Sequence, residues 1–258
     1  MEVHHHPKLN HNPKPWKEYF LEFLMIVLAV TTGFFAESFR EYQTDREKEK
    51  QAIESLVKCL VSDTLQLKNI IESNNLIAMN LDSLILLKNA DLTTEENKKK
   101  FYTYGSTGFF QDWYFKINDA AMQQLKSTGM LRLIRNQNII DNIFGYELKN
   151  KITVAQEADC YYFFKLSLVD YTKVADLSHI KDTSIVGFTI NNRFVNFNYK
   201  NVHSLSLNMD KDRLTSVFSN AALMSASVEG YALFMQDQMD YAKKLIDLLK
   251  KEYHLENE

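Results

Sequence analysis

The placement of proline constrains the fold of this chain more than any other feature. All three prolines, Pro7, Pro13 and Pro15, lie near the N-terminus of the 258 residues, and none follows. The chain also contains only 7 glycines. Sandwiches and barrels need frequent turns rich in these two residues, whereas helices do without them. The sequence therefore excludes an all-β fold, argues against a doubly wound α/β fold, and predicts an all-α protein.

The overall composition limits the class of partner. The chain is 45% hydrophobic and 24% charged, which is typical of a folded protein. The formal net charge is −3 and the isoelectric point is about 6.2. A nucleic-acid-binding domain normally carries a strong basic excess. We therefore expect no nucleic acid among the partners.

The most apolar segment is residues 19–39, with the sequence YFLEFLMIVLAVTTGFFAESF. As a helix it is about 31 Å long and matches a hydrocarbon core of about 30 Å. Trp16 and Tyr42 flank it, as aromatic residues do at membrane interfaces. A cleaved signal peptide and a buried globular helix are the alternatives, but no small-x-small cleavage site follows. The segment is interpreted as a transmembrane helix, with a His-rich tail at 1–18 and a helical extramembrane domain at 40–258.

The orientation of this span is predicted less directly. Lysines and arginines are similar in number on the two flanks of the span, with Lys8, Lys14 and Lys17 before it and Arg40, Arg46, Lys48 and Lys50 after it, so the positive-inside rule barely decides. An uncleaved signal anchor normally leaves its short basic N-terminus in the cytoplasm. We therefore predict a cytoplasmic N-terminus and export of the rest of the chain.

One face of the span carries its smallest and most polar residues. Glu22, Ala29, Gly33 and Glu37 fall along one stripe at helical spacing. Ala29 and Gly33 form a small-xxx-small pair, which allows helices to approach closely in lipid. The two glutamates are either hydrated at the headgroups or face other helices. The stripe predicts a membrane-helix interface, and thus a homo-oligomer or a membrane partner protein.

Beyond the span, the hydrophobic pattern predicts a long-helix antiparallel bundle. Helical spacing runs through residues 53–84, where Asn74-Asn75 suggests a kink, through 137–176, and through 211–253. Asn136 and Asp210 are expected N-caps, and Gly129 is expected to end a short helix. The predicted apolar side of 137–176 consists of Ile139, Ile140, Ile143, Phe144, Ile152, Ala155, Tyr162, Phe163, Leu166 and Val169.

Two segments do not follow the long helices. Residues 105–108, GSTG, are predicted to be an interhelical loop. Near 180–207 the pattern alternates in places around Asn191-Asn192, which suggests a small irregular or β-hairpin insertion. Such a hairpin is marginal unless it packs on helices.

No catalytic motif is present, so no enzyme activity and no cofactor are predicted. The tail residues His4, His5, His6 and His11 are weak metal-ligand candidates, because a His-rich tract binds metals but a tail lacks second-shell support. Cys59 and Cys160 are interpreted as small core residues. A disulfide between them is the alternative if this part of the chain is exported.

Three stretches together resemble one family. They are WKEYFLEFLMIVLAVTTGFFAESFRE, LKSTGMLRLIRNQNIIDNI and KKLIDLLKKEY. They are similar to an uncharacterised family of single-pass membrane proteins of Gram-negative bacteria, with an N-terminal span and a helical domain. The resemblance covers most of the chain and is weakest at 178–207. It implies a helical fold and the bacterial inner membrane, and it implies no reaction. The orientation predicted above would place most of the chain in the periplasm.

Three functions are compatible with these features. The leading hypothesis is a membrane-anchored, non-enzymatic scaffold or subunit of a membrane complex that self-associates. The alternatives are an oligomeric membrane effector or ion-conducting component, as in antiphage defence, and a periplasmic ligand sensor that needs a partner. The lipid bilayer is the expected partner in all three, and the sequence identifies no small-molecule ligand.

Overall fold

The computed structural model describes residues 15–111, 118–186 and 195–255. These residues form an all-α protein in which the chain divides into two compact units, Met1–Lys50 and Gln51–Glu258. The first element, α1 (Trp16–Leu86), is one continuous helix with residues in both units. No proline occurs in it to interrupt its hydrogen bonds.

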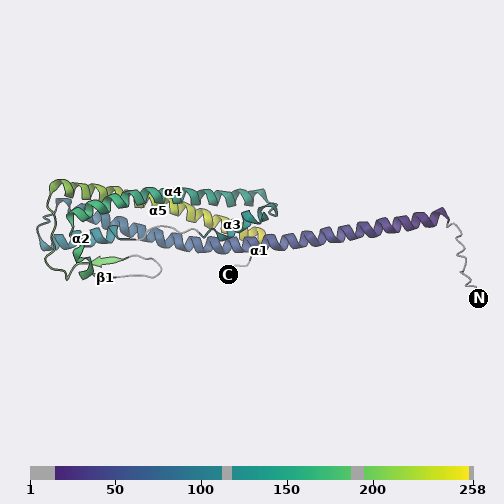
Figure 1. Cartoon of the computed structure of the whole chain (residues 1–258), viewed down its shortest axis with the longest axis horizontal. Coiled ribbons are helices and arrows are strands. Elements are labelled where there is room, and N and C mark those ends of the chain that lie inside the picture. Colours follow the sequence, from purple (N-terminus) through teal and green to yellow (C-terminus); the bar gives the residue numbers. More distant parts are fainter. Residues whose placement is uncertain (1–14, 112–117, 187–194, 256–258) are drawn as a thin grey trace, which may run out of the picture. The chain divides into compact units, whose positions relative to one another are not determined.

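Three long helices build the second unit: the part of α1 from Gln51 onwards, α4 (Gln137–Val174) and α5 (Lys211–Tyr253). They lie side by side, with α5 antiparallel to the other two (Figure 1). The predicted caps are confirmed, because the side chain of Asn136 accepts from the N–H of Asn138 and that of Asp210 accepts from Arg213. The predicted long-helix bundle is thus correct.

The core of this unit consists of two hydrophobic clusters along the bundle. One lies where the end of α1 meets the start of α5, and it includes Leu81, Phe101, Tyr171 and Val217. The other lies where the start of the α1 segment meets the end of α5, and it includes Ile53, Leu60, Ile143 and Leu249. The antiparallel course of α5 brings these distant parts of the sequence together.

Asn74-Asn75 does not interrupt α1. The helix continues to Leu86 and is followed by a 3-10 turn, η1 (Leu87–Asn89). Asn75 is exposed, whereas Asn74 is fully buried and its side-chain amide has no hydrogen-bond partner within the described residues. The low helix propensity of asparagine amounts to less than about 1 kcal/mol per residue, so packing overrides it.

The predicted loop at 105–108 is wrong, because these residues are buried in α2 (Glu95–Phe109). A Cβ atom on Gly105 would collide with the ring of Tyr171, and one on Gly108 would collide with the side chain of Leu81. The two glycines therefore serve close packing of α2 against α4 and α1, and they do not mark a turn. Thr94 caps the helix by accepting from the N–H of Asn97.

A small hairpin follows α4, as predicted. After η3 (Leu177–Asp182), β1 (Ser184–Val186) pairs antiparallel with β2 (Asn196–Asn198), with Ile185 opposite Phe197. Asn191-Asn192, the predicted turn, lies outside the described residues.

The hairpin is held by side chains at the end of α2. The Gln111 amide donates to the carbonyl of Val195 at 2.5 Å and accepts from its N–H at 2.8 Å. Thr107 Oγ1 accepts from the N–H of Phe197 at 3.1 Å. These bonds take the place of a further strand, which explains how a two-stranded ribbon persists here.

The segment between α2 and α4 contains α3 (Ala120–Ser127) and η2 (Met130–Arg132). Gly129 lies between them with φ of 69°, the left-handed conformation predicted for it. In the assembled unit, α3 packs its apolar residues Met122 and Leu125 into the second cluster. This packing places the start of α3 over α1 and α4.

Candidate functional site

The predicted membrane-helix interface lies on the N-terminal part of α1. Glu22, Ala29, Gly33 and Glu37 are all exposed on this helix. Glu37 forms an ion pair with Arg40, one turn further along. A Cβ atom on Gly33 would have no neighbour within 4 Å. The structure therefore leaves the small-residue stripe open, without showing what lies against it.

This part of α1 is long and apolar enough to cross a membrane, and none of its most apolar stretch is buried in the described structure. Its large apolar side chains from Tyr19 to Phe39 are between 42% and 71% exposed. The hydroxyls within the stretch are satisfied along the helix: Thr31 donates to the carbonyl of Val27, and Thr32 donates to that of Leu28. Such back-bonding is how threonine is accommodated in lipid.

The other predicted candidates give no site in the described chain. His4, His5, His6 and His11 lie outside the described residues. Among the residues that are described, no group of three His, Cys, Asp or Glu side chains is placed to hold a metal ion.

The two cysteines are not joined by a disulfide, and both thiols are free. Cys160 is buried and its Sγ donates to the carbonyl of Ser227 at 3.3 Å. Burial raises the pKa of the Cys160 thiol to about 12, with the carboxylates of Asp159 and Glu157 adding to the shift. A thiol with so high a pKa is a poor nucleophile, because the thiolate is the reactive form.

A buried polar network crosses the bundle and was not predicted from the sequence. Tyr146 on α4 donates its hydroxyl to Asp63 Oδ2 on α1 at 2.8 Å. One turn along α4, Asn150 accepts from the Gln238 amide of α5, and Thr153 donates to Gln238 Oε1 at 2.5 Å. The network thus links all three long helices through hydrogen bonds inside the core.

Asp63 is the charged member of this network and is only 2% exposed. Its other oxygen, Oδ1, accepts from the backbone N–H of Asn118 at 3.1 Å. Burial raises the pKa of Asp63, the two hydrogen bonds oppose this, and the nearby Asp119 carboxylate raises it further. Burial likewise raises the pKa of the Tyr146 hydroxyl, with the charge of Asp63 adding to the effect.

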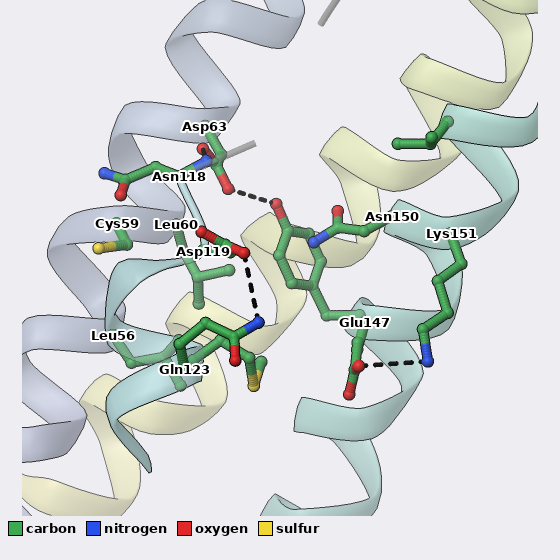
Figure 2. Close-up of a pocket in the computed structure, with 13 residues that line it drawn as sticks. Leu56, Cys59, Leu60, Asp63, Asn118, Asp119, Gln123, Glu147, Asn150 and Lys151 are labelled. Carbon is green, nitrogen blue, oxygen red and sulfur yellow. Dashed lines mark hydrogen bonds and ion pairs between the residues drawn. The ribbon is translucent and has the colours of Figure 1, made fainter. Parts of the chain in front are cut away.

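A pocket of about 300 Å³ opens beside this network, between α1, α3 and α4 (Figure 2). Asp63, Tyr146 and Asn150 line it from the core, and the apolar side chains of the wall come from each of the three helices. The apolar wall consists of Leu56, Cys59, Leu60, Met122 and Val154. A concave apolar site with a few converging polar groups is the usual form of a small-molecule site.

The more exposed polar residues of the pocket come from α3 and α4. Asp119 accepts from the Gln123 amide at 3.3 Å. Glu147 pairs with Lys126 at 2.5 Å and with Lys151 at 3.2 Å. The hydrogen bond from Lys126, assisted by Lys151, lowers the pKa of Glu147. The negative charge of Glu147 is therefore balanced by two lysines, whereas the hydrogen bonds to Asp63 come from neutral donors.

The sequence contains a signal for this site that periodicity alone does not separate from core. Asp63 lies on the same helical stripe as Leu56, Leu60 and Leu67, which are all buried. On α4, Tyr146 and Asn150 continue the buried stripe of Ile139 and Ile143 in the same way. A polar residue on a buried stripe is the informative deviation, but its partner on another helix can be found only in three dimensions.

These features define a class: an all-α protein with one N-terminal helix long and apolar enough to span a membrane, and a helical unit with a largely apolar pocket beside a buried polar network. In comparisons with known proteins, no family model, no curated protein and no solved structure matches the chain.

Proposed function

We propose that this chain is a single-pass protein of a bacterial inner membrane that acts as a non-enzymatic, self-associating scaffold or membrane-complex subunit. Its N-terminus lies in the cytoplasm and its helical unit in the periplasm. The uncharacterised single-pass family that the sequence resembles likewise has an N-terminal span followed by a helical domain.

The observation that carries this proposal is the exposure of the apolar part of α1. Thirteen large apolar side chains would face water there if the protein were not in lipid: Tyr19, Phe20, Leu21, Phe23, Leu24, Met25, Ile26, Val27, Leu28, Val30, Phe34, Phe35 and Phe39. Exposed apolar patches on soluble monomers rarely exceed a few hundred Å². A bilayer removes this surface from water, and the self-satisfied threonines suit it.

A second exposed apolar surface, on α4, supports the scaffold role. Phe144, Ile152, Tyr162, Leu166 and Val169, expected on the buried side, are between 37% and 65% exposed. The face that packs into the bundle is instead that of Ile139, Tyr146, Cys160 and Tyr171. A helix that is apolar on two faces is typical of one that contacts a second surface, and a second copy of this chain is the partner we propose.

The test of membrane anchoring is fractionation of the full chain after carbonate extraction. We expect the wild type in the membrane pellet. Leu28→Arg should move a substantial fraction to the supernatant, because an arginine at the helix centre costs about 2.5 to 3.5 kcal/mol on insertion. The matched control is Leu65→Arg, an exposed leucine of α1 in the second unit, which should stay in the pellet. Wild type in the supernatant would refute the anchor.

The topology needs a separate measurement. In a Cys59→Ser/Cys160→Ser background, a cysteine at the exposed Lys88 should react with a membrane-impermeant maleimide in intact spheroplasts. A cysteine at Lys8 should react only after lysis. The reverse pattern would overturn the proposed orientation and leave the anchor intact.

The pocket favours a second function, ligand sensing in the periplasm. Its volume, its enclosure by three helices and its link to a buried polar network give the helical unit a place for a small molecule. A ligand there would contact α1, the helix that also carries the apolar segment. A partner protein would have to supply the output.

A further inference from the structure

Among the described residues that line the pocket, the carboxylates are not balanced by cations. Asp63 and Asp119 both line it, and within the described residues neither forms an ion pair with a lysine or an arginine. Hydrogen bonds from Tyr146 and Asn118 to Asp63 stabilise its charge only in part, because both donors are neutral. An ionised carboxylate that is 2% exposed without a cation is destabilising.

Two lysines beside the pocket, within the described residues, are paired with another carboxylate. Lys151, the one basic residue among those lining the pocket, and Lys126 both contact the same oxygen of Glu147. Figure 2 shows Lys151 directed to Glu147, on the opposite side of the pocket from Asp63 and Asp119. The lining residues thus present two carboxylates that an incoming cation could pair with.

The residues that line the pocket suit an organic cation better than a metal ion. The described structure places no three His, Cys, Asp or Glu side chains to coordinate a metal. Leu56, Leu60, Met122 and Val154 instead offer an apolar surface next to the two carboxylates. A volume of about 300 Å³ lies at the lower end of the range for small-molecule sites, so the ligand is small.

We propose that this pocket binds a small protonated amine, with its ammonium group between Asp63 and Asp119 and its alkyl body along the apolar wall of α1, α3 and α4. This inference extends the ligand-sensing candidate and does not depend on the membrane anchor. The ammonium group would pair with the buried carboxylate, and the alkyl body would remove apolar wall from water.

The experiment compares three probes of equal chain length: n-butylammonium, n-butanol and butyrate. Binding to the full chain in phosphatidylcholine nanodiscs is measured by calorimetric titration at neutral pH, with empty nanodiscs subtracted. We expect butylammonium to bind at least ten times more tightly than butanol, and butyrate to show no binding. Equal affinity for the ammonium and the alcohol would overturn the proposal. So would the absence of binding heat at butylammonium concentrations up to about 50 times a millimolar dissociation constant, which corresponds to a binding free energy on the order of 4 kcal/mol.

Variants then locate the site. Asp119→Asn changes an exposed residue ahead of α3, so it should leave the fold intact and weaken butylammonium binding about tenfold. Val154→Trp, at an exposed wall position, should fill the pocket and abolish binding. Asp212→Asn also removes one negative charge, but in the first turn of α5 and outside the pocket lining, so it should leave the affinity for butylammonium unchanged.

The outcomes separate this inference from the proposed function. Binding that survives both Asp119→Asn and Val154→Trp would place the amine elsewhere and overturn the inference. A wild-type chain that binds butylammonium through this pocket but leaves the membrane in carbonate would refute the anchor alone. Because variants share one lipid composition, partition of the amine into lipid cancels in each comparison.

Discussion

Asp63 shows how a single side chain can shape the chemistry of a helical bundle. It replaces an apolar residue on the buried stripe of α1, and Tyr146 and the N–H of Asn118 are directed at its two oxygens. Replacement by a leucine of similar size would leave both donors unsatisfied, at about 1 to 3 kcal/mol for each. The carboxylate therefore organises the contact of α1 with α4 and with the start of α3.

The pH dependence of stability should report the ionisation of Asp63. Its pKa is raised in the folded protein above the ordinary value of 3.8, mainly by burial. In the window between these two pKa values the folded state binds more protons than the unfolded state, so its stability falls as pH rises. Asp63→Asn removes this loss. The variant should gain stability relative to the wild type as pH rises from about 4 through the raised pKa of Asp63, and the difference should then level off.

The measurement is denaturant unfolding of the full chain, followed by far-ultraviolet circular dichroism between pH 4 and pH 8. Asp212→Asn, at an exposed position, is the control and should give a difference from wild type that varies little with pH. A difference for Asp63→Asn that stays constant across the range would show that Asp63 does not titrate in this window.

At the scale of elements, helix ends could be predicted from the sequence and one helix interior could not. Asn136, Asp210 and Gly129 were identified because capping is a local interaction, readable from a few neighbouring residues. The last part of α2, residues 105–109, was missed because its two glycines are also turn residues, and their role depends on Tyr171 and Leu81, which are distant in sequence. On α4 the apolar residues occupy two faces, so periodicity does not tell which face is buried.

Close packing at Gly105 leads to a prediction for α2. In Gly105→Ala the added methyl collides with the fully buried ring of Tyr171. Overpacking costs about 1 to 3 kcal/mol, and the better helix propensity of alanine offsets at most about 1 kcal/mol of that. We expect a lower free energy of unfolding, measured with denaturant. The control is Gly230→Ala in α5, where the methyl meets nothing within 4 Å and should stabilise by up to about 1 kcal/mol. A stabilised Gly105→Ala would show that α2 does not pack as described.

At the scale of the whole molecule, the sequence predicted an all-α chain with an apolar N-terminal helix, and the structure agrees. The absence of proline after Pro15 and the long apolar run are properties of the sequence as a whole, so they need no knowledge of contacts. The pocket was not predicted, because it depends on Asp63, Asp119 and Tyr146, which come from three separate segments. The predicted interface at Glu22, Ala29, Gly33 and Glu37 stays a prediction, since it concerns a contact between chains.

The last prediction concerns that contact. Helices in lipid gain no hydrophobic driving force from association, so close approach at small residues has to supply it. Gly33 has no neighbour within 4 Å of its added Cβ, so Gly33→Leu should leave the single chain unchanged while blocking approach between two chains. Light scattering of the detergent-solubilised protein should give an oligomer for the wild type and a smaller mass for Gly33→Leu. Val27→Leu, which adds one methylene at an exposed position away from the stripe, should keep the wild-type mass. A monomeric wild type, or the same oligomer for Gly33→Leu, would reject association through Ala29 and Gly33.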